Sequence, residues 1–294
     1  MGKANVTKRC HWVPQAYLRG FASDDEKKKI WRFGRTSGDP ELKGIDKVAV
    51  RFHLYVPKDA DGQRDDSFEH KLADLEQWFG SVVWKKLRDD MIDLSWDPLR
   101  KMVSLLAATL MLRNPAFLQL TQEMHAQLVD FHSGPGGPAS SVEINGKEYE
   151  LDLEKWPAYR DAGEDDIKRF WIEEISGAGV YAKMFMAMRW SMVIADQPVF
   201  ITSDNPITFL HPSDRFRGIK NSETSILFPI SPARLLLFDN RTSEPANQYY
   251  PLKGNGGAHN LLIWRNANEH MFSHRNPDEV CAEMLKASEE FGSS

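Results

Sequence analysis

Phe200-Ile201-Thr202-Ser203-Asp204-Asn205-Pro206 is the stretch of sequence on which the fold prediction depends. Residues 199–201 are β-branched or aromatic, which predicts a strand, and Pro206 disfavours helical backbone at the residue before it. The next four residues, Thr202 to Asn205, all carry hydrogen-bonding side chains. Polar residues on a loop after an apolar strand are typical of a site, because a rigid scaffold often holds functional residues on loops. An Asx-turn at Asp204 is the simpler alternative for one of them.

The middle of the chain has the 3.6-residue periodicity of helices. Apolar residues share one helical face from Phe68 to Leu87, and Asp97-Pro98 starts a second helix that runs to Arg113. Asn114-Pro115 is expected to break this second helix, because proline cannot continue it. Two further helical stretches are expected, at residues 116–131 and at residues 164–196, the latter bent near Gly177 and Gly179.

Strand patterns occupy the two ends of the chain. Residues 30–33 and 48–56 alternate between apolar and polar side chains and are expected to form an antiparallel pair. Residues 225–230 and 234–239 are expected to be neighbouring buried strands, and Pro277 opens a C-terminal amphipathic helix. The predicted class is therefore α+β, with an antiparallel or mixed sheet of N- and C-terminal strands packed against a central set of long helices.

We expect residues 1–294 to form a single domain. The strongest interruption is the Gly- and Pro-rich segment from His132 to Pro138. It is expected to open an excursion at residues 132–160, a loop with a small hairpin, because Asn145-Gly146 is a favoured two-residue hairpin turn.

Composition excludes several classes of protein. The chain has 294 residues, 41% of them hydrophobic, and a net charge of −5 from 37 basic and 42 acidic residues, so there is no overall basic field for nucleic acid. Its longest apolar run, Met102 to Leu112, is about half of the roughly 20 residues that span a membrane, so no membrane span is expected. The N-terminus lacks a secretory signal core, and the two cysteines form no CxxC motif. We therefore expect a soluble cytoplasmic protein with reduced thiols.

Several segments together resemble one known family. They are His11-x-x-Pro14-x-x-Tyr17-Leu18-x-x-Phe21, the helix with Glu69 and Glu76, Arg113-Asn114-Pro115, residues 200–206, and Phe228-Pro229-Ile230-Ser231-Pro232. In order and spacing they resemble the bacterial and phage-associated family of proteins of unknown function numbered 4238. The resemblance covers nearly the whole chain and implies a single full-length domain, but no settled activity. It marks these motif positions: His11, Gln15, Tyr17, Glu69, Glu76, Arg113, Asp204 and Asn205.

The acidic motif positions are candidates for a metal site. Glu69 and Glu76 share a helix face but lie about 10.5 Å apart along its axis. Because Mg²⁺ holds its oxygen ligands at about 2.0–2.1 Å, at most one of these carboxylates is expected to join Asp204 around one ion. The other would then pair with Arg113 or another base. The alternative is that both glutamates belong to an exposed, charged helix face.

The basic motif positions also have alternative interpretations. His11 suits a general acid or base, a metal ligand, or a helix-capping residue whose ring is held by a backbone carbonyl. Arg113 suits either a cap on the carbonyls at a helix end or a two-pronged clamp on a phosphate or carboxylate. The sequence has no GxGxxG after a strand, no GxxxxGK[ST], no HExxH and no GxSxG elbow, so the corresponding dinucleotide, P-loop, zinc-protease and serine-hydrolase chemistries are not predicted.

The leading hypothesis is a hydrolase of phosphodiester or nucleotide type, a nuclease-like enzyme with a phage-associated or defence role that uses Mg²⁺ or Mn²⁺. Nucleic acid or a nucleotide would be its partner. Three residues are assigned to catalysis: His11, Asp204 and Glu69. Five are assigned to substrate binding: Gln15, Tyr17, Arg113, Asn205 and Ser203. Three are candidate metal ligands: Asp204, Glu69 and Glu76.

The alternative hypothesis is a non-catalytic binding or sensor module. In that case the same polar residues form a buried hydrogen-bond network that joins the N-terminal segment to the strand near residue 200. The two hypotheses differ in geometry, because catalysis requires His11, Glu69 and Asp204 to share one cleft.

Overall fold

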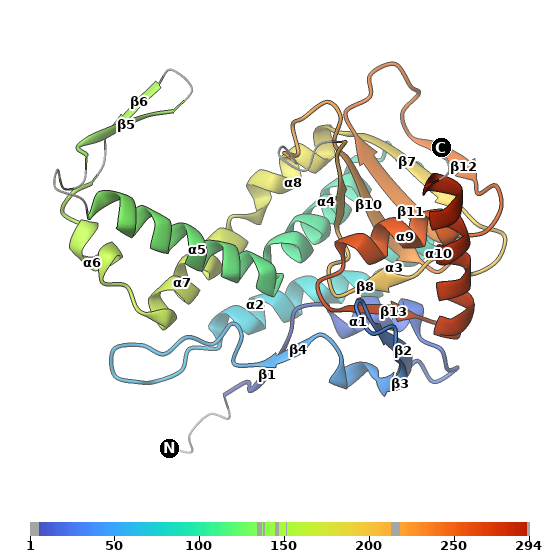
Figure 1. Ribbon diagram of the computed structural model, residues 1–294, viewed down its shortest axis with the longest axis horizontal. Coiled ribbons are helices and arrows are strands. Elements are labelled where there is room, and N and C mark those ends of the chain that lie inside the picture. The colour runs from blue at the N-terminus through green and yellow to red at the C-terminus, as the bar shows by residue number, and fades with distance from the viewer. Residues whose placement is uncertain are drawn as a thin grey trace.

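The computed structural model describes residues 6–133, 137, 139–144, 147–150, 152–212 and 218–292. It has the α+β fold that the sequence predicts. The two larger sheets lie on one side of the molecule, and a group of helices fills the middle and extends to the other side (Figure 1).

The N-terminal part contains, in chain order, β1 (Arg9–His11), α1 (Gln15–Leu18), the 3-10 turn η1 (Arg19–Phe21), β2 (Lys29–Gly34), β3 (Pro40–Gly44), η2 (Ile45–Lys47) and β4 (Val50–Phe52). β2 forms a hairpin with β3, whereas β4 pairs with β1. The expected pairing of residues 30–33 with residues 48–56 is therefore wrong. A left-handed turn at Gly38 brings the chain straight back after β2, and left-handed backbone at Ala49 and His53 restricts β4 to three residues.

The helical middle contains α2 (Ser67–Glu76), η3 (Gln77–Gly80), α3 (Val82–Asp89), α4 (Asp97–Leu112) and α5 (Pro115–His132). α4 is the central helix, because it is buried over most of its length and packs against α8 (Ala178–Ala187). The break at Asn114-Pro115 is confirmed: Asn114 accepts a hydrogen bond from the N–H of Ala116 and caps α5. The helix expected from Phe68 to Leu87 is divided, because Ser81 caps a new helix, α3.

Helices and a hairpin form an arm at one end of the molecule (Figure 1). Besides α5, the arm contains β5 (Ser141–Ile144), β6 (Lys147–Glu150), α6 (Trp156–Arg160) and α7 (Glu164–Ser176). β5 and β6 pair in antiparallel fashion, so the hairpin is confirmed. Its turn residues, Asn145 and Gly146, lie outside the described residues.

The larger sheet has the strand order β12-β7-β11-β10-β9. Its strands are β7 (Arg189–Ile194), β9 (Thr208–Leu210), β10 (Ser225–Ser231), β11 (Arg234–Asp239) and β12 (Gln248–Pro251). The pairing of β10 with β11 is confirmed. A continuous helix to residue 196 is wrong, because residues 189–194 form β7. Trp190 and Met192 are fully buried on this strand, and ladder bonds to β11 and β12 outweigh the helical pattern of the preceding residues.

The second sheet has the order β3-β2-β13-β8, with β8 at Thr202–Ser203 and β13 at His270–Ser273. β2 from the N-terminal part pairs with β13 from the C-terminal part, so the meeting of the two ends of the chain in one sheet is confirmed. Two C-terminal helices, α9 (Gly257–Asn266) and α10 (Pro277–Gly292), pack against each other beside this sheet (Figure 1). β8 consequently lies where the sheet meets the helices.

Within the described part of the chain, no single helix has the length and apolar character needed to cross a membrane. α4 and α5 pass that test only as a pair, which is bent by 57° at the Asn114 break.

Candidate functional site

Asp204, which directly follows β8, is a buried structural anchor. Its side chain accepts three backbone hydrogen bonds from one turn: Oδ1 from the N–H of Asn268 at 2.8 Å, and Oδ2 from those of Glu269 and His270 at 2.8 and 3.0 Å. Burial raises the pKa of the Asp204 carboxyl above its ordinary value, and the three N–H donors oppose that shift. The carboxylate thus bonds a distant turn at the start of β13, rather than its own backbone in an Asx-turn.

Two aromatic side chains of the N-terminal segment reach the same region. The indole N–H of Trp12 donates to the carbonyl of Asp204 at 2.9 Å. The hydroxyl of Tyr17 donates to the carbonyl of Pro229 at 2.7 Å and lies 2.8 Å from Oγ1 of Thr202. Because Tyr17 is fully buried and its hydroxyl has these partners, it joins the N-terminal segment to β8 and β10.

Asn114 connects the start of α5 with this junction. Its amide nitrogen donates to the carbonyl of Asp204 at 3.1 Å and to Oδ1 of Asn205 at 3.3 Å, and its Oδ1 accepts from the side chain of Asn268 at 2.8 Å. Asn205 in turn donates to the carbonyl of Asn266 at 2.9 Å. The hydroxyl of Ser203, which is also buried, bonds locally to the backbone of Asn205. This set of amides fixes α5, β8 and the turn before β13 relative to one another.

The guanidinium of Arg113 faces the other way, toward α2 and β1. It is 2% exposed, donates to Oε1 of Glu76 at 2.7 Å, and also donates to the carbonyl of His11. The hydroxyl of Tyr55 donates to the carbonyl of Arg113 at 2.5 Å. The structure thus shows the guanidinium of Arg113 engaged with protein partners, and Glu76 is the glutamate that pairs with it.

Glu69 lies beside the same cluster, near the thiol of Cys10. Burial raises the pKa of Cys10 to about 12, and the neighbouring carboxylate of Glu69 adds to this shift. Burial likewise raises the pKa of Glu69. Because Cys10 keeps its proton at neutral pH, it is not an activated nucleophile.

His11 is held by backbone and amide groups. Its Nε2 lies 3.2 Å from the carbonyl of Asp46, and its Nδ1 lies 3.5 Å from the amide nitrogen of Gln15. Burial lowers the pKa of His11, the bond to Asp46 opposes this shift, and the nearby charge of Arg9 adds to it. Of the three interpretations of His11, this geometry matches a ring held by a backbone carbonyl.

The predicted site residues therefore divide into two neighbouring clusters. His11, Gln15, Glu69, Glu76 and Arg113 gather on one side of the α4–α5 break. Four others gather on the other side around the turn before β13: Tyr17, Ser203, Asp204 and Asn205. Among the described residues, no group of three or more His, Cys, Asp or Glu side chains is arranged to hold a metal ion. The grouping of Asp204, Glu69 and Glu76 as ligands of Mg²⁺ or Mn²⁺ is not supported, since Glu76 binds Arg113 and Asp204 binds backbone N–H groups.

A cavity of about 630 Å³ opens directly beside the Asp204 cluster. Its walls come from Trp12, Arg35 and Arg51, from the first two turns of α5, and from Asp204 with the turn at residues 268–269. Neither His11 nor Glu69 lines it. We call this space the arginine cavity.

Two arginines give this cavity its chemistry. The guanidinium of Arg51 lies over the ring of Trp12, 5.4 Å from its centroid, and 3.8 Å from the carboxylate of Glu269. Arg35 donates from Nη1 to the carbonyl of Ala267 at 2.9 Å. Since each guanidinium has five N–H donors, both retain donors for a bound anion. The first turn of α5 adds no free backbone donor, because Asn114 accepts from the N–H groups of the two residues after Pro115.

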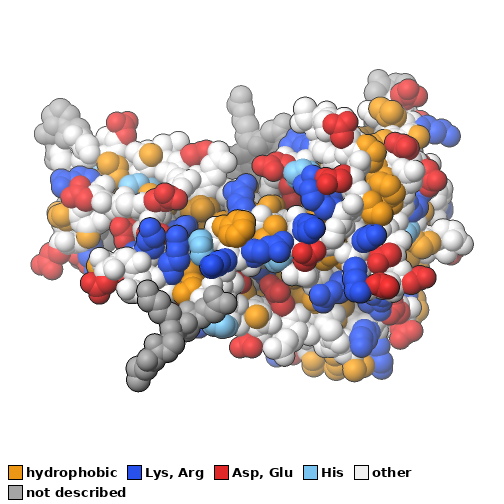
Figure 2. Space-filling view, turned by 90° about the horizontal axis from the view of Figure 1, so that it is seen from below, with side chains coloured by type: hydrophobic (Ala, Val, Ile, Leu, Met, Phe, Trp, Pro, Cys, Tyr) orange, Lys and Arg blue, Asp and Glu red, His pale blue; other side chains and the backbone are white. Residues whose placement is uncertain are grey.

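The sequence alone did not single out Arg35 or Arg51. Arg35 lies in the turn after β2, and Arg51 lies in the short strand β4, so neither belongs to a recognisable motif. Figure 2 shows the face of the molecule on which β1 and β4 lie, and Lys and Arg side chains form a band across it despite the net charge of −5.

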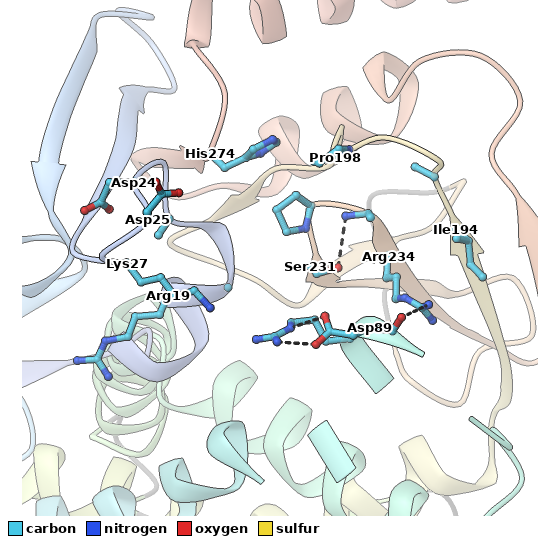
Figure 3. Close-up of a pocket in the computed structure, with 16 residues that line it drawn as sticks. Arg19, Asp24, Asp25, Lys27, Asp89, Ile194, Pro198, Ser231, Arg234 and His274 are labelled. Carbon is cyan, nitrogen blue, oxygen red and sulfur yellow. Dashed lines mark hydrogen bonds and ion pairs between the residues drawn. The ribbon is translucent and has the colours of Figure 1, made fainter. Parts of the chain in front are cut away.

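A second cavity, of about 620 Å³, lies where η1, the end of α3 and the β10–β11 turn meet (Figure 3). Ser231 and Pro232, from the second motif of the C-terminal part, line it. Two of its four cations are engaged by the protein: Arg88 pairs with Asp89 at 2.6 Å, and Arg234 donates to the carbonyls of Asp89 and Asp90. Arg234, two residues after this motif, therefore fastens the end of α3 to the larger sheet.

The fold and this junction define an α+β protein in which a buried polar network adjoins an arginine-lined cavity. The family model described as "Protein of unknown function (DUF4238)" matches residues 9–280, so the chain belongs to this family. No match was found among curated proteins or among solved structures.

Proposed function

We propose that this protein is a non-catalytic binding module that takes a phosphate-bearing ligand in the arginine cavity. The observation that carries the proposal is the presence of Arg35 and Arg51, both with donors to spare, in one cavity of about 630 Å³. Guanidinium groups bind phosphate by parallel N–H···O bonds, which suits a nucleotide or the backbone of a nucleic acid.

The polar network supports a binding role because it holds the cavity walls in place. Trp12 is bonded to Asp204, and Asn114 bonds both Asp204 and Asn268, so three walls share one set of hydrogen bonds. A preformed cavity loses little conformational entropy when it binds a ligand.

The two free cysteines fit the reducing cytoplasm that the sequence predicts.

Hydrolysis of the bound phosphodiester is a second candidate, because Asp204 lines the same cavity. It is less well supported than binding. Both oxygens of Asp204 already accept backbone hydrogen bonds, and the other two proposed catalytic residues, His11 and Glu69, face the other cluster.

Calorimetric titration of the full chain with AMP and with a short oligonucleotide tests the binding proposal. Replacing Arg51 by alanine removes a charged donor, and hydrogen bonds to charged groups contribute about 1.5–3 kcal/mol, so we expect affinity to fall roughly ten- to hundredfold. Arg160→Ala is the matched control, since Arg160 is similarly exposed and pairs with an acidic neighbour outside the cavity. Equal affinity of wild type and Arg51→Ala for both ligands contradicts the proposal.

The same ligands, incubated with Mg²⁺ or Mn²⁺, test the hydrolase candidate. We expect no turnover above the uncatalysed rate. Turnover that Asp204→Asn abolishes while ligand binding persists would replace the binding module with an enzyme.

A further inference from the structure

An apolar chamber adjoins the arginine cavity. It has a volume of about 290 Å³ and lies between the turn after β2, α9 and α10. Its apolar walls include Phe33, Trp264, Met271, Met284 and Leu285. Leu285 is 67% exposed, so the chamber leaves apolar surface in contact with water that a ligand would cover.

Arg35 is common to the two spaces. It lines both the arginine cavity and the apolar chamber. Three bonds hold it in that position: its N–H donates to the carbonyl of Glu269 at 2.8 Å, its carbonyl accepts from the indole of Trp264 at 3.0 Å, and its side chain donates to the carbonyl of Ala267. An anion bound by Arg35 is therefore one side chain away from the apolar chamber.

The lining of the chamber favours an aliphatic chain over a nucleobase. Among the residues that line it, none has an amide or carboxylate side chain that could pair with the edge of a base. The methionines at positions 271 and 284 are flexible and polarisable, and such side chains adapt to chains of different shape.

We infer that the ligand is an amphipathic anion, an alkyl phosphate in its simplest form, with its phosphate on Arg35 and Arg51 and its chain in the apolar chamber. This inference rests on the proposed function, because the arginine cavity must first bind phosphate. It goes further by naming the group attached to that phosphate.

Octyl phosphate and ethyl phosphate, both below the concentration at which octyl phosphate forms micelles, are the probes for calorimetry on the full chain. Each buried methylene is expected to tighten binding about fourfold, which corresponds to ~0.8 kcal/mol, so octyl phosphate should bind at least tenfold more tightly. Ser288→Phe places a ring on the lining of the chamber, leaves both arginines unchanged, and should abolish this difference. Ala282→Phe, on an exposed position of α10, is the matched control and should keep it.

Cys281 provides a second measurement, because it lines the chamber and the other cysteine, Cys10, is buried. Octyl phosphate should slow modification of Cys281 by N-ethylmaleimide at least severalfold, and ethyl phosphate should not.

The outcomes separate the two proposals. Equal binding of the two phosphates that depends on Arg51 overturns the amphipathic ligand and leaves the proposed function standing, as does tighter binding of AMP than of octyl phosphate. Absence of binding by all three compounds overturns both proposals.

Discussion

Replacing Asp204 by alanine is expected to destabilise the protein severely. The substitution removes the acceptor for three backbone N–H groups, those of residues 268–270, at a position where Asp204 is 1% exposed. Each buried donor left without a partner costs about 1–3 kcal/mol. Because residues 268–270 are partly accessible to water, which can replace some of these bonds, we expect a total loss of about 3–5 kcal/mol.

Urea denaturation followed by circular dichroism measures this loss as a lower transition midpoint with an unchanged slope. Asp204→Asn keeps one acceptor oxygen but turns an amide N–H₂ toward backbone donors, so its loss should be intermediate. Asp93→Ala is the control, since Asp93 also accepts a backbone hydrogen bond, from Ser95, but on the surface, where water substitutes for it.

A free energy of unfolding for Asp204→Ala within about 0.5 kcal/mol of the wild type would refute this reasoning. If that variant also lost a biochemical activity, the catalytic assignment of Asp204 would be favoured instead. The stability and the activity of Asp204→Ala, measured together, therefore separate a structural anchor from a catalytic group.

Three further predictions concern stability. Burial, aided by the charge of the adjacent arginine, lowers the pKa of His274 from its ordinary 6.5 to about 4, so its contribution to stability is present above pH 6.5 and is lost as pH falls toward 4. Relative to His274→Gln, the free energy of unfolding of the wild type should fall by about 1 kcal/mol between pH 7 and pH 5 in urea titrations. An unchanged difference between the two proteins would contradict this prediction. Gly257→Ala would push a methyl group against the backbone of α10 and should cost about 1–3 kcal/mol of stability. Gly179→Ala, with open space around it, should be neutral or stabilising by thermal melting. If Gly179→Ala were the more destabilising of the two, α9 and α10 would pack differently. Arg113→Lys should cost about 1–3 kcal/mol of stability, because a lysine cannot bond Glu76 and the carbonyl of His11 at once as the guanidinium does. A melting temperature equal to that of wild type would show that this pair of bonds is unimportant.

Local sequence patterns predicted the elements whose stability depends on nearby residues. The break at Asn114-Pro115, the β10–β11 pair and the C-terminal helix from Pro277 all follow from proline geometry, capping or short-range alternation. The motif around Asp204 was also recognisable, since four polar side chains after an apolar strand are unusual whatever they contact.

The partners of those polar residues depended on the tertiary structure. Asp204 bonds a turn more than sixty residues away, and Trp12 bonds Asp204 across 192 residues, so no local pattern could reveal that the carboxylate holds backbone rather than a metal or substrate. The wrong prediction of the partner of β2 has the same origin. Left-handed backbone in the N-terminal part and the distant strand β13 decide which strands pair with β2.

The amino-acid sequence by itself thus determined the α+β class, the principal helices and the set of polar positions, because these follow from periodicity and backbone preferences over a few residues. Only the tertiary structure decided that those positions form two separate clusters, and that Arg35 and Arg51, which belong to no motif, line a common cavity. The physical reason is that a cavity is made by side chains from segments far apart in the chain, and their approach is set by the packing of the whole core rather than by any one segment.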